Sequence, residues 1–219
     1  QGNVSVLGAV SAQGNVEIRS NAGRILLGGG GASATGSFKI TGGTNTQIRI
    51  AGAQSGQAFA RTALSGSEGI LISTLGGAID VANAGLSAVS GDIRLDASTD
   101  ELFNGGNITI GNGTSISGSD DVLLAGANLL LQQASSIESG RDGAVTLLAN
   151  SNIKLASSMI TGSQVDIISG NEILLDNSTI DGGISYLSAA DVRSENAVTL
   201  QGDALTVEGG TIDLRSANI

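Results

Sequence analysis

Carboxylates are the groups in this sequence best suited to chemistry. The 219 residues include no His and no Cys, which excludes Ser–His and Cys–His nucleophiles as well as imidazole and thiolate metal ligands. Acidic residues occur in adjacent pairs, at Asp100/Glu101 and at Asp120/Asp121. Carboxylates that converge on one face could cleave a glycan by acid–base chemistry. Alternatively, Asp120 and Asp121 together with Asp142 could supply oxygen ligands to calcium.

Turn positions give both acidic pairs a simpler role. Asp is common in turns because its side chain bonds the nearby backbone, and both pairs lie between predicted strands. Asp166 and Asp176 fall on different faces of one predicted coil, so they do not form a catalytic pair. We therefore expect a protein that is not an enzyme and that binds no metal or cofactor. A glycan-active enzyme, either a polysaccharide lyase or a hydrolase, is the alternative.

Two groups of apolar residues are candidates for contact with a partner. Phe59 and Phe103 occur in two segments that interrupt the repeat described below, 53–68 and 98–106, and loops on a rigid scaffold often carry recognition. The second group consists of leucines that should point outward from strands, where either another molecule or a part of the same chain must cover them. These leucines are Leu26, Leu71, Leu123, Leu130 and Leu174.

The composition limits both the fold and the partners. Hydrophobic residues make up 40% of the chain, too many for a disordered chain, and they are mostly Val, Ile, Leu and Ala, which suit stacked strands. The net charge of −10 argues against nucleic acids and anionic membrane surfaces as partners. No apolar run approaches the roughly 20 residues that span a bilayer, so membrane insertion is not expected. The chain opens on Gln1 without a signal-peptide pattern, as a processed product or an excised segment would.

A repeat of about 20 residues is visible from Ser119 onward. Each copy contains three short apolar pulses separated by Gly, Asn, Ser or Asp, and apolar residues alternate within a pulse as they do in a β-strand. The pulses are too close for βαβ crossovers, whereas a three-stranded coil places each strand about 4.8 Å from its predecessor. In the first pulse, the residues predicted to point inward are Val122/Leu124, Val145/Leu147, Val165/Ile167, Ile184/Tyr186 and Leu205/Val207.

The N-terminal half follows the same plan with wider steps at the two insertions. About ten coils result, which corresponds to a rod on the order of 50 Å long. The sequence therefore predicts an all-β protein, a right-handed parallel β-helix (solenoid) of about ten three-stranded coils, with residues 1–219 forming a single segment excised from a longer chain.

Outward residues test this register. If it is right, opposite charges occupy adjacent rungs at Glu17–Lys39, Arg49–Asp80 and Arg193–Asp213. Asn107, Asn128 and Asn152 each directly precede an inward residue in consecutive coils. Their side chains could bond the backbone of a turn, or one another from rung to rung.

Three pulses, Asn152-Ile-Lys-Leu-Ala, Glu172-Ile-Leu-Leu-Asp and Thr211-Ile-Asp-Leu-Arg-Ser, resemble the filamentous haemagglutinin family. These are large exoproteins of Gram-negative two-partner secretion. The resemblance implies the shaft of an adhesin, extracellular or on the cell surface of a Gram-negative-type bacterium, and it carries over no functional residue. The implied partner is a host or neighbouring cell surface, the extracellular matrix or a glycan. A self-assembling extracellular filament, in which copies of the chain stack through their open coil ends, is a further alternative.

Overall fold

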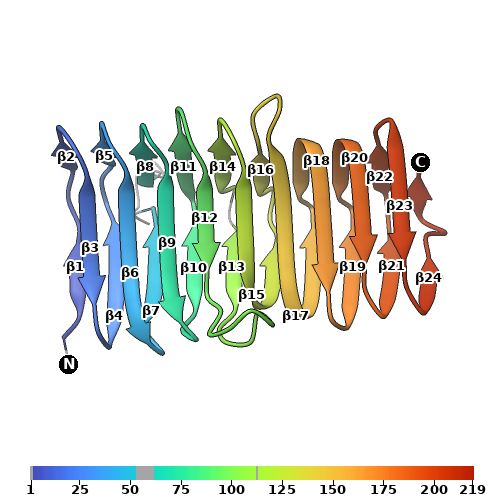
Figure 1. Ribbon diagram of the computed structural model, residues 1–219, viewed down its shortest axis with the longest axis horizontal. Coiled ribbons are helices and arrows are strands. Elements are labelled where there is room, and N and C mark those ends of the chain that lie inside the picture. The colour runs from blue at the N-terminus through green and yellow to red at the C-terminus, as the bar shows by residue number, and fades with distance from the viewer. Residues whose placement is uncertain (1, 53–61, 112) are drawn as a thin grey trace.

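The predicted fold is confirmed by the computed structural model, which describes residues 2–52, 62–111 and 113–219. The described residues form 25 strands in one continuous parallel ladder. In Figure 1 the strands at the front run downward while the coils advance from the N-terminus at the left to the C-terminus at the right, which is a right-handed winding. Each coil contributes one strand to each of three parallel sheets, named here in the order in which the chain visits them in the sequence repeat.

The first sheet lies at the front of Figure 1. It consists of β3 (Val16–Ser20), β6 (Phe38–Thr44), β9 (Ile70–Leu75), β12 (Ile93–Asp96), the first half of β15 (Val122–Leu131), the first half of β17 (Ala144–Ala156), the second half of β18 (Met159–Ser169), the second half of β20 (Thr179–Ser188) and β23 (Ala204–Glu208).

The second and third sheets each have ten rungs. The second consists of β1 (Val4–Val6), β4 (Arg24–Gly28), β7 (Gln47–Ala51), β10 (Ile79–Ala82), β13 (Ile108–Gly111), the second halves of β15 and β17, β19 (Glu172–Asp176), β21 (Asp191–Glu195) and β24 (Thr211–Asp213). The third consists of β2 (Val10–Ala12), β5 (Ala32–Ala34), β8 (Thr62–Gly66), β11 (Ala84–Ala88), β14 (Ser115–Gly118), β16 (Ser136–Glu138), the first halves of β18 and β20, β22 (Val198–Gln201) and β25 (Ala217–Asn218).

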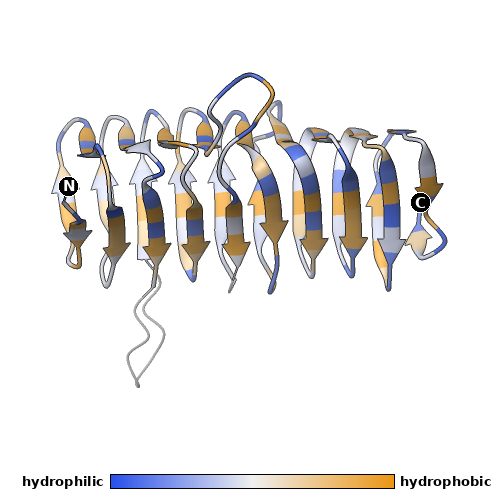
Figure 2. Ribbon diagram, turned by 90° about the horizontal axis from the view of Figure 1, so that it is seen from below, coloured by the Kyte–Doolittle hydropathy of each residue, from blue (hydrophilic) through white to orange (hydrophobic). Residues whose placement is uncertain are grey.

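A single hydrophobic core runs the length of the rod. Alternate residues of every strand point inward, and the buried ones form one cluster, visible as the hydrophobic bands of the strands in Figure 2. Ile48, Ile79, Ile108 and Ile153 belong to one column of the second sheet, and each is 0% exposed. Branched aliphatic side chains suit such columns because they pack against identical neighbours one rung away.

The predicted charge pairs are ladder neighbours at Glu17–Lys39, Arg49–Asp80 and Arg193–Asp213. Only some of these ladder neighbours form an ion pair with each other. The Nζ atom of Lys39 lies 4.0 Å from Glu17, whereas Arg193 forms its ion pair with Glu172, one rung away on the side opposite Asp213. The backbone ladder fixes which residues are neighbours, but a long exposed side chain can reach several of them, so the register alone does not determine its ion-pair partner.

One predicted register is wrong. Ile184 and Tyr186 were expected to point inward, but Ser185 and Leu187 occupy those positions, and Ile184 is 56% exposed. Ser185 pairs with inward Val165 because the corner before it has the same length as the corner in the preceding coil. Tyr186 instead points outward, and its hydroxyl donates to the carboxylate of Glu208 at 2.8 Å. The corner length, which the sequence pattern does not reveal, overrides the apolar character of the two side chains.

The predicted asparagine ladder is confirmed and is longer than expected. Asn128 Nδ2 donates to Asn107 Oδ1 at 2.9 Å, Asn152 to Asn128 at 3.0 Å and Asn171 to Asn152 at 2.8 Å. Left-handed backbone angles occur at Asn45 of this corner but recur from coil to coil at a different one, between the second and third sheets. The residues with positive φ there include Asn83, Ser157, Asn177 and Asn196.

The two predicted insertions have different outcomes. Thr62–Gly66 is strand β8, which is stacked between β5 and β11, so the end of the segment 53–68 belongs to a regular coil. Residues 53–61, including Phe59, lie outside the described residues. The segment 98–106 is a loop between β12 and β13, closed at its base by a bridge between Ser98 and Gly105, and Figure 2 shows it standing out from the row of coils.

Ser185 offers a test of the register. Its hydroxyl is buried and has no hydrogen-bond partner within the described part of the chain, and its column neighbours are Val165 and Leu205. Replacing Ser185 with Val should raise the free energy of unfolding by about 1–2 kcal/mol, because it removes an unsatisfied polar atom and adds apolar contact. Urea unfolding monitored by circular dichroism measures this, and a loss of stability in both Ser185→Val and the smaller Ser185→Ala would contradict the register.

Candidate functional site

The predicted outward leucines are half-buried rather than exposed. All five point away from the core, with Leu71 and Leu123 on the first sheet and the other three on the second. Each has a Lys or Arg as a ladder neighbour: Leu26–Arg49, Leu71–Lys39, Leu123–Arg94, Leu130–Lys154 and Leu174–Arg193. The aliphatic stems of these cations can cover apolar surface while their charged ends remain in water. The register therefore places a cation stem where it could cover each of these leucines, and contact with a partner stays a prediction.

The large apolar side chains that are well exposed were not among those predicted. They include Val89 and Leu102, both 70% exposed, Leu7 at 65% and Ile184 at 56%. Single exposed apolar residues are common on soluble proteins and need no partner. Leu102 differs because it lies in the loop between β12 and β13, next to the predicted contact residue Phe103.

Hydrogen bonds within the loop 98–106 give it a defined shape. Asp100 Oδ1 accepts from the backbone amides of Leu102 and Asn104, both at 3.1 Å, and Oδ2 accepts from Asn104 Nδ2 at 3.0 Å. The hydrogen bond from the Asn104 side chain is the main reason that the pKa of Asp100 lies below its ordinary value. Asn150 Nδ2 donates to Asn104 Oδ1 at 2.6 Å, which ties the loop to a coil two rungs further along.

Phe103 adopts a strained backbone conformation in this loop. Its φ is 58°, in the left-handed region, which costs a bulky residue on the order of 1–3 kcal/mol. The backbone amide of Phe103 donates to the carbonyl of Asp100 at 3.1 Å, which holds this conformation. The side chain is half-buried. The structure thus places Phe103 on a rigid projection, separate from the half-buried leucines.

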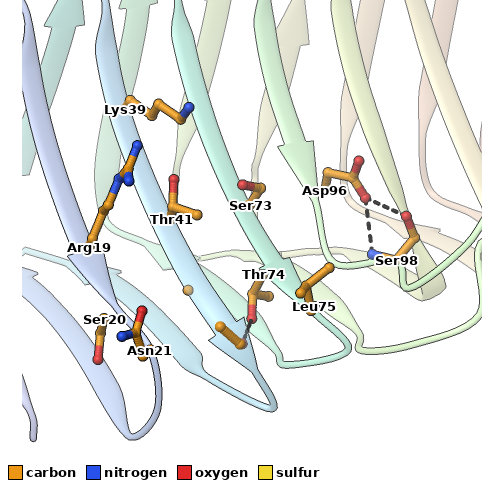
Figure 3. Close-up of a pocket in the computed structure, with 12 residues that line it drawn as sticks. Arg19, Ser20, Asn21, Lys39, Thr41, Ser73, Thr74, Leu75, Asp96 and Ser98 are labelled. Atoms are coloured by element: carbon orange, nitrogen blue, oxygen red, sulfur yellow. Dashed lines mark hydrogen bonds between the residues drawn. The ribbon is translucent and has the colours of Figure 1, made fainter.

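A groove of about 420 Å³, lined mostly by residues with polar side chains, crosses the first sheet in the N-terminal half (Figure 3). Four successive rungs, β3, β6, β9 and β12, contribute to it. One ladder position supplies Arg19, Thr41, Ser73 and Asp96 in order along the rod axis. The volume falls within the range of small-molecule sites, about 300–1,000 Å³. Sequence reasoning missed this groove, although the polar column was available as a signal.

The groove is bounded by a corner and by a loop. The pairing of β6 with β9 shifts between Gly42 and Thr44, and this bulge forms one wall. A side chain at Gly43 is excluded, because its Cβ would lie 2.2 Å from the carbonyl oxygen of Asn21. The next residue after Asp96 in the same column, Ala125, is only 1% exposed, so the groove ends there. The loop 98–106 begins at that end.

The charges of the groove are arranged with cations toward the N-terminal rungs and a carboxylate at the closed end. Arg19 contacts Glu17 Oε1 through Nη2 at 2.6 Å, and Lys39 Nζ lies 4.0 Å from the same oxygen. One carboxylate is thus shared by two cations. At the other end, Asp96 accepts from the Ser98 hydroxyl and its backbone amide, at 2.5 Å and 3.0 Å, as Figure 3 shows.

Asp96 is held in its ionised form. Partial burial alone would raise its pKa, but the hydrogen bonds from Ser98 and from the Arg94 guanidinium more than offset that effect, and the pKa of Asp96 lies below its ordinary value. An ionised carboxylate accepts hydrogen bonds, for example from the hydroxyls of a ligand. A general acid would instead need a raised pKa.

The other acidic residues named from the sequence do not meet. Across the described ranges, no three His, Cys, Asp or Glu side chains are grouped so that they could hold a metal ion, which includes the calcium grouping of Asp120, Asp121 and Asp142. Asp121 Oδ1 accepts from the backbone amide of Ala144 at 2.8 Å, a structural bond between coils. None of the described residues belongs to a helix long and apolar enough to cross a membrane.

Comparison of the chain with protein-family models, with curated proteins and with solved structures found no match.

Lys154 tests whether cation stems cover the outward leucines. It lies between Leu130 and Leu174 in the second sheet. Lys154→Ala should lower the free energy of unfolding by about 0.5–1 kcal/mol because the stem is lost. Lys154→Met keeps an unbranched stem without the charge and should retain the stability of the original protein in urea unfolding. If both variants match the original protein, the stem does not stabilise the leucines.

The depressed pKa of Asp96 should make the free energy of unfolding depend on pH. Because its folded-state pKa is depressed, its contribution is present above the unfolded pKa of about 3.9 and is lost as the pH falls through the lower folded value. Asp96→Asn should therefore cost about 1 kcal/mol at pH 7, from weakened hydrogen bonds that solvent partly screens. The difference between variant and original protein should close in acid, and a difference that stays constant from pH 7 to pH 2 would contradict the assignment.

Proposed function

We propose that this chain is a structural shaft of a secreted or surface-exposed bacterial adhesin or filament. One observation carries the proposal: the register of all three sheets continues through the described chain, from β1 to β25. The wide steps at the two insertions do not interrupt it, because the strands on either side of each insertion still pair with adjacent coils. The rod therefore behaves as one unit along its axis.

The direction of the interactions suits a spacer. Backbone hydrogen bonds between parallel strands run along the rod axis, and each coil packs its inward residues on the next. Each coil therefore extends the rod by about 4.8 Å without a new domain boundary. A shaft of this kind holds a binding tip away from a surface because the stack resists bending.

The proposal places the protein outside the cell, on the surface of a Gram-negative-type bacterium. The contacted partner is then a host or neighbouring cell surface, the extracellular matrix or a glycan. The net charge of −10 keeps such a rod soluble and disfavours contact with nucleic acid. The ionised state of Asp96 makes the groove better suited to holding a hydroxyl-bearing ligand than to protonating a glycosidic oxygen.

Spin-label distances test the rod as a spacer. The outward column of the third sheet runs from Ser33 to Gln201 through seven rung spacings. Since the chain has no Cys, labels on Ser33→Cys and Gln201→Cys would be unique. Pulsed electron–electron double resonance should give one narrow distribution of distances between the two labels, centred at about 34 Å. Deleting residues 152–171 removes one coil, because Asn152 and Glu172 occupy equivalent positions, and should shorten the distance by about 5 Å.

Deletions of whole coils, like that of residues 152–171, also test the spacer function on cells. The full chain and chains lacking one to four coils would be placed between an outer-membrane anchor and a peptide tag on a Gram-negative bacterium. Binding of a bulky antibody to the tag should fall as coils are removed, while a small-molecule stain of the tag stays constant. Antibody binding that is independent of coil number would contradict the shaft, and so would release of shorter products from a polysaccharide incubated with the purified chain.

A further inference from the structure

We propose that the groove on the first sheet binds a linear oligosaccharide that carries carboxylate groups, lying along the rod axis. The inference adds a ligand site to the chain and does not depend on the shaft function. It rests on the groove's shape across four rungs, on the order of its polar groups and on a buried hydroxyl in its lining.

The shape of the groove matches an extended chain parallel to the rod. Four of its lining residues, Arg19, Thr41, Ser73 and Asp96, come from one ladder position in four consecutive rungs, so a polar side chain recurs about every 4.8 Å. An unbranched polymer presents hydroxyls at regular intervals and can bond one rung after another. The groove ends at the buried residue Ala125, so a bound chain would not extend beyond the rung of β12.

The chemistry of the lining favours a sugar over a peptide. Five hydroxyl residues contribute to the lining: Ser20, Thr41, Ser73, Thr74 and Ser98. The hydroxyls of Ser20, Thr74 and Ser98 already donate within the chain and retain only acceptor capacity, whereas a hydroxyl that is free within the described residues, such as that of Ser73, can both donate and accept, as sugar hydroxyls do. Of the strands that form the floor, β6, β9 and β12 are paired on both sides, so a peptide strand could be added only at the outer edge of β3, at the end of the sheet.

The charge order explains why the sugar should be acidic. Arg19 and Lys39 share the single carboxylate of Glu17, which leaves guanidinium and ammonium donors for an additional anion. Both cations belong to the lining, and they are two of only ten in a chain with 20 acidic residues. At the other end, ionised Asp96 accepts hydrogen bonds from ligand hydroxyls. A ligand carboxylate therefore belongs over β3 and β6, and neutral hydroxyls belong near β12.

Thr41 supplies an independent observation. Its Oγ1 is buried and makes no hydrogen bond within the described residues, and the residue lines the groove between the cations and Ser73. A buried hydroxyl without a partner is costly and calls for an explanation. Because the residue as a whole is only half-buried, a rotation of its side chain would bring the hydroxyl to a ligand hydroxyl in the groove and satisfy it.

Calorimetric titration of the full chain tests the site. The probe is a tetramer of galacturonic acid, and the matched control is the same tetramer with its carboxylates methyl-esterified. We expect the acid form to bind with a salt-dependent affinity and the ester to bind at least tenfold more weakly. Lys39→Met should weaken binding of the acid about tenfold, whereas Lys154→Met, which removes a cation from the second sheet, should bind like the original protein.

Thr41→Val separates binding from folding. Because the hydroxyl has no partner in the described chain, its loss should leave the unfolding midpoint unchanged or higher, yet affinity should fall several-fold. The proposal is overturned if the ester binds as tightly as the acid, if Lys154→Met weakens binding as much as Lys39→Met, or if neither groove variant changes affinity. Failure of binding with the 34 Å label distance intact would reject this site and leave the shaft standing.

Discussion

The vertical stacking of inward side chains is the constraint on which the rest of the structure depends. Each coil has a narrow interior that is filled by its own side chains and closed only by the coils above and below. No single coil can bury its apolar residues alone, so stability comes from contacts between neighbours. This explains why Ile, Leu and Val recur at fixed positions while the residues between them vary freely, and why bulky aromatic side chains suit the interior poorly: the chain has only four. Phe38, fully buried in the first sheet, is an exception.

The same constraint decides what the sequence can reveal. Alternation and coil length were sufficient to predict the three sheets, the outward columns and the asparagine ladder, because all of these repeat from coil to coil. Ile184 and Tyr186 show the limit. Hydropathy favours both as inward residues, but the corner that precedes them has a fixed length and places Ser185 in the column. A corner contributes few apolar residues, so its length leaves little trace in the hydrophobic pattern.

The candidate site was predictable only in its parts. The loop 98–106 and Phe103 were identified because they break the repeat, whereas the groove was missed because it does not. Arg19, Thr41, Ser73 and Asp96 are separated by more than 20 residues at each step and look ordinary one at a time. The ladder aligns them in consecutive rungs, and the bulge at Gly43 lies in the wall of the same groove. A search for polar columns, made after the register is assigned, would have found them.

Outward residues can therefore be substituted without disturbing the packing of the hydrophobic core. A Thr or Arg at an outward position keeps the backbone ladder and the inward stack intact, so a binding surface can be composed rung by rung. Leucines at outward positions alternate with Lys and Arg instead of stacking on one another, an order that would let the stem of each cation cover a neighbouring leucine. The groove lies beside that alternation, in the next outward column of the first sheet, where hydroxyls and charges occupy consecutive rungs. A rod of this construction can carry recognition along its side without a separate binding domain, since the scaffold that spaces the coils also spaces the ligand-binding groups.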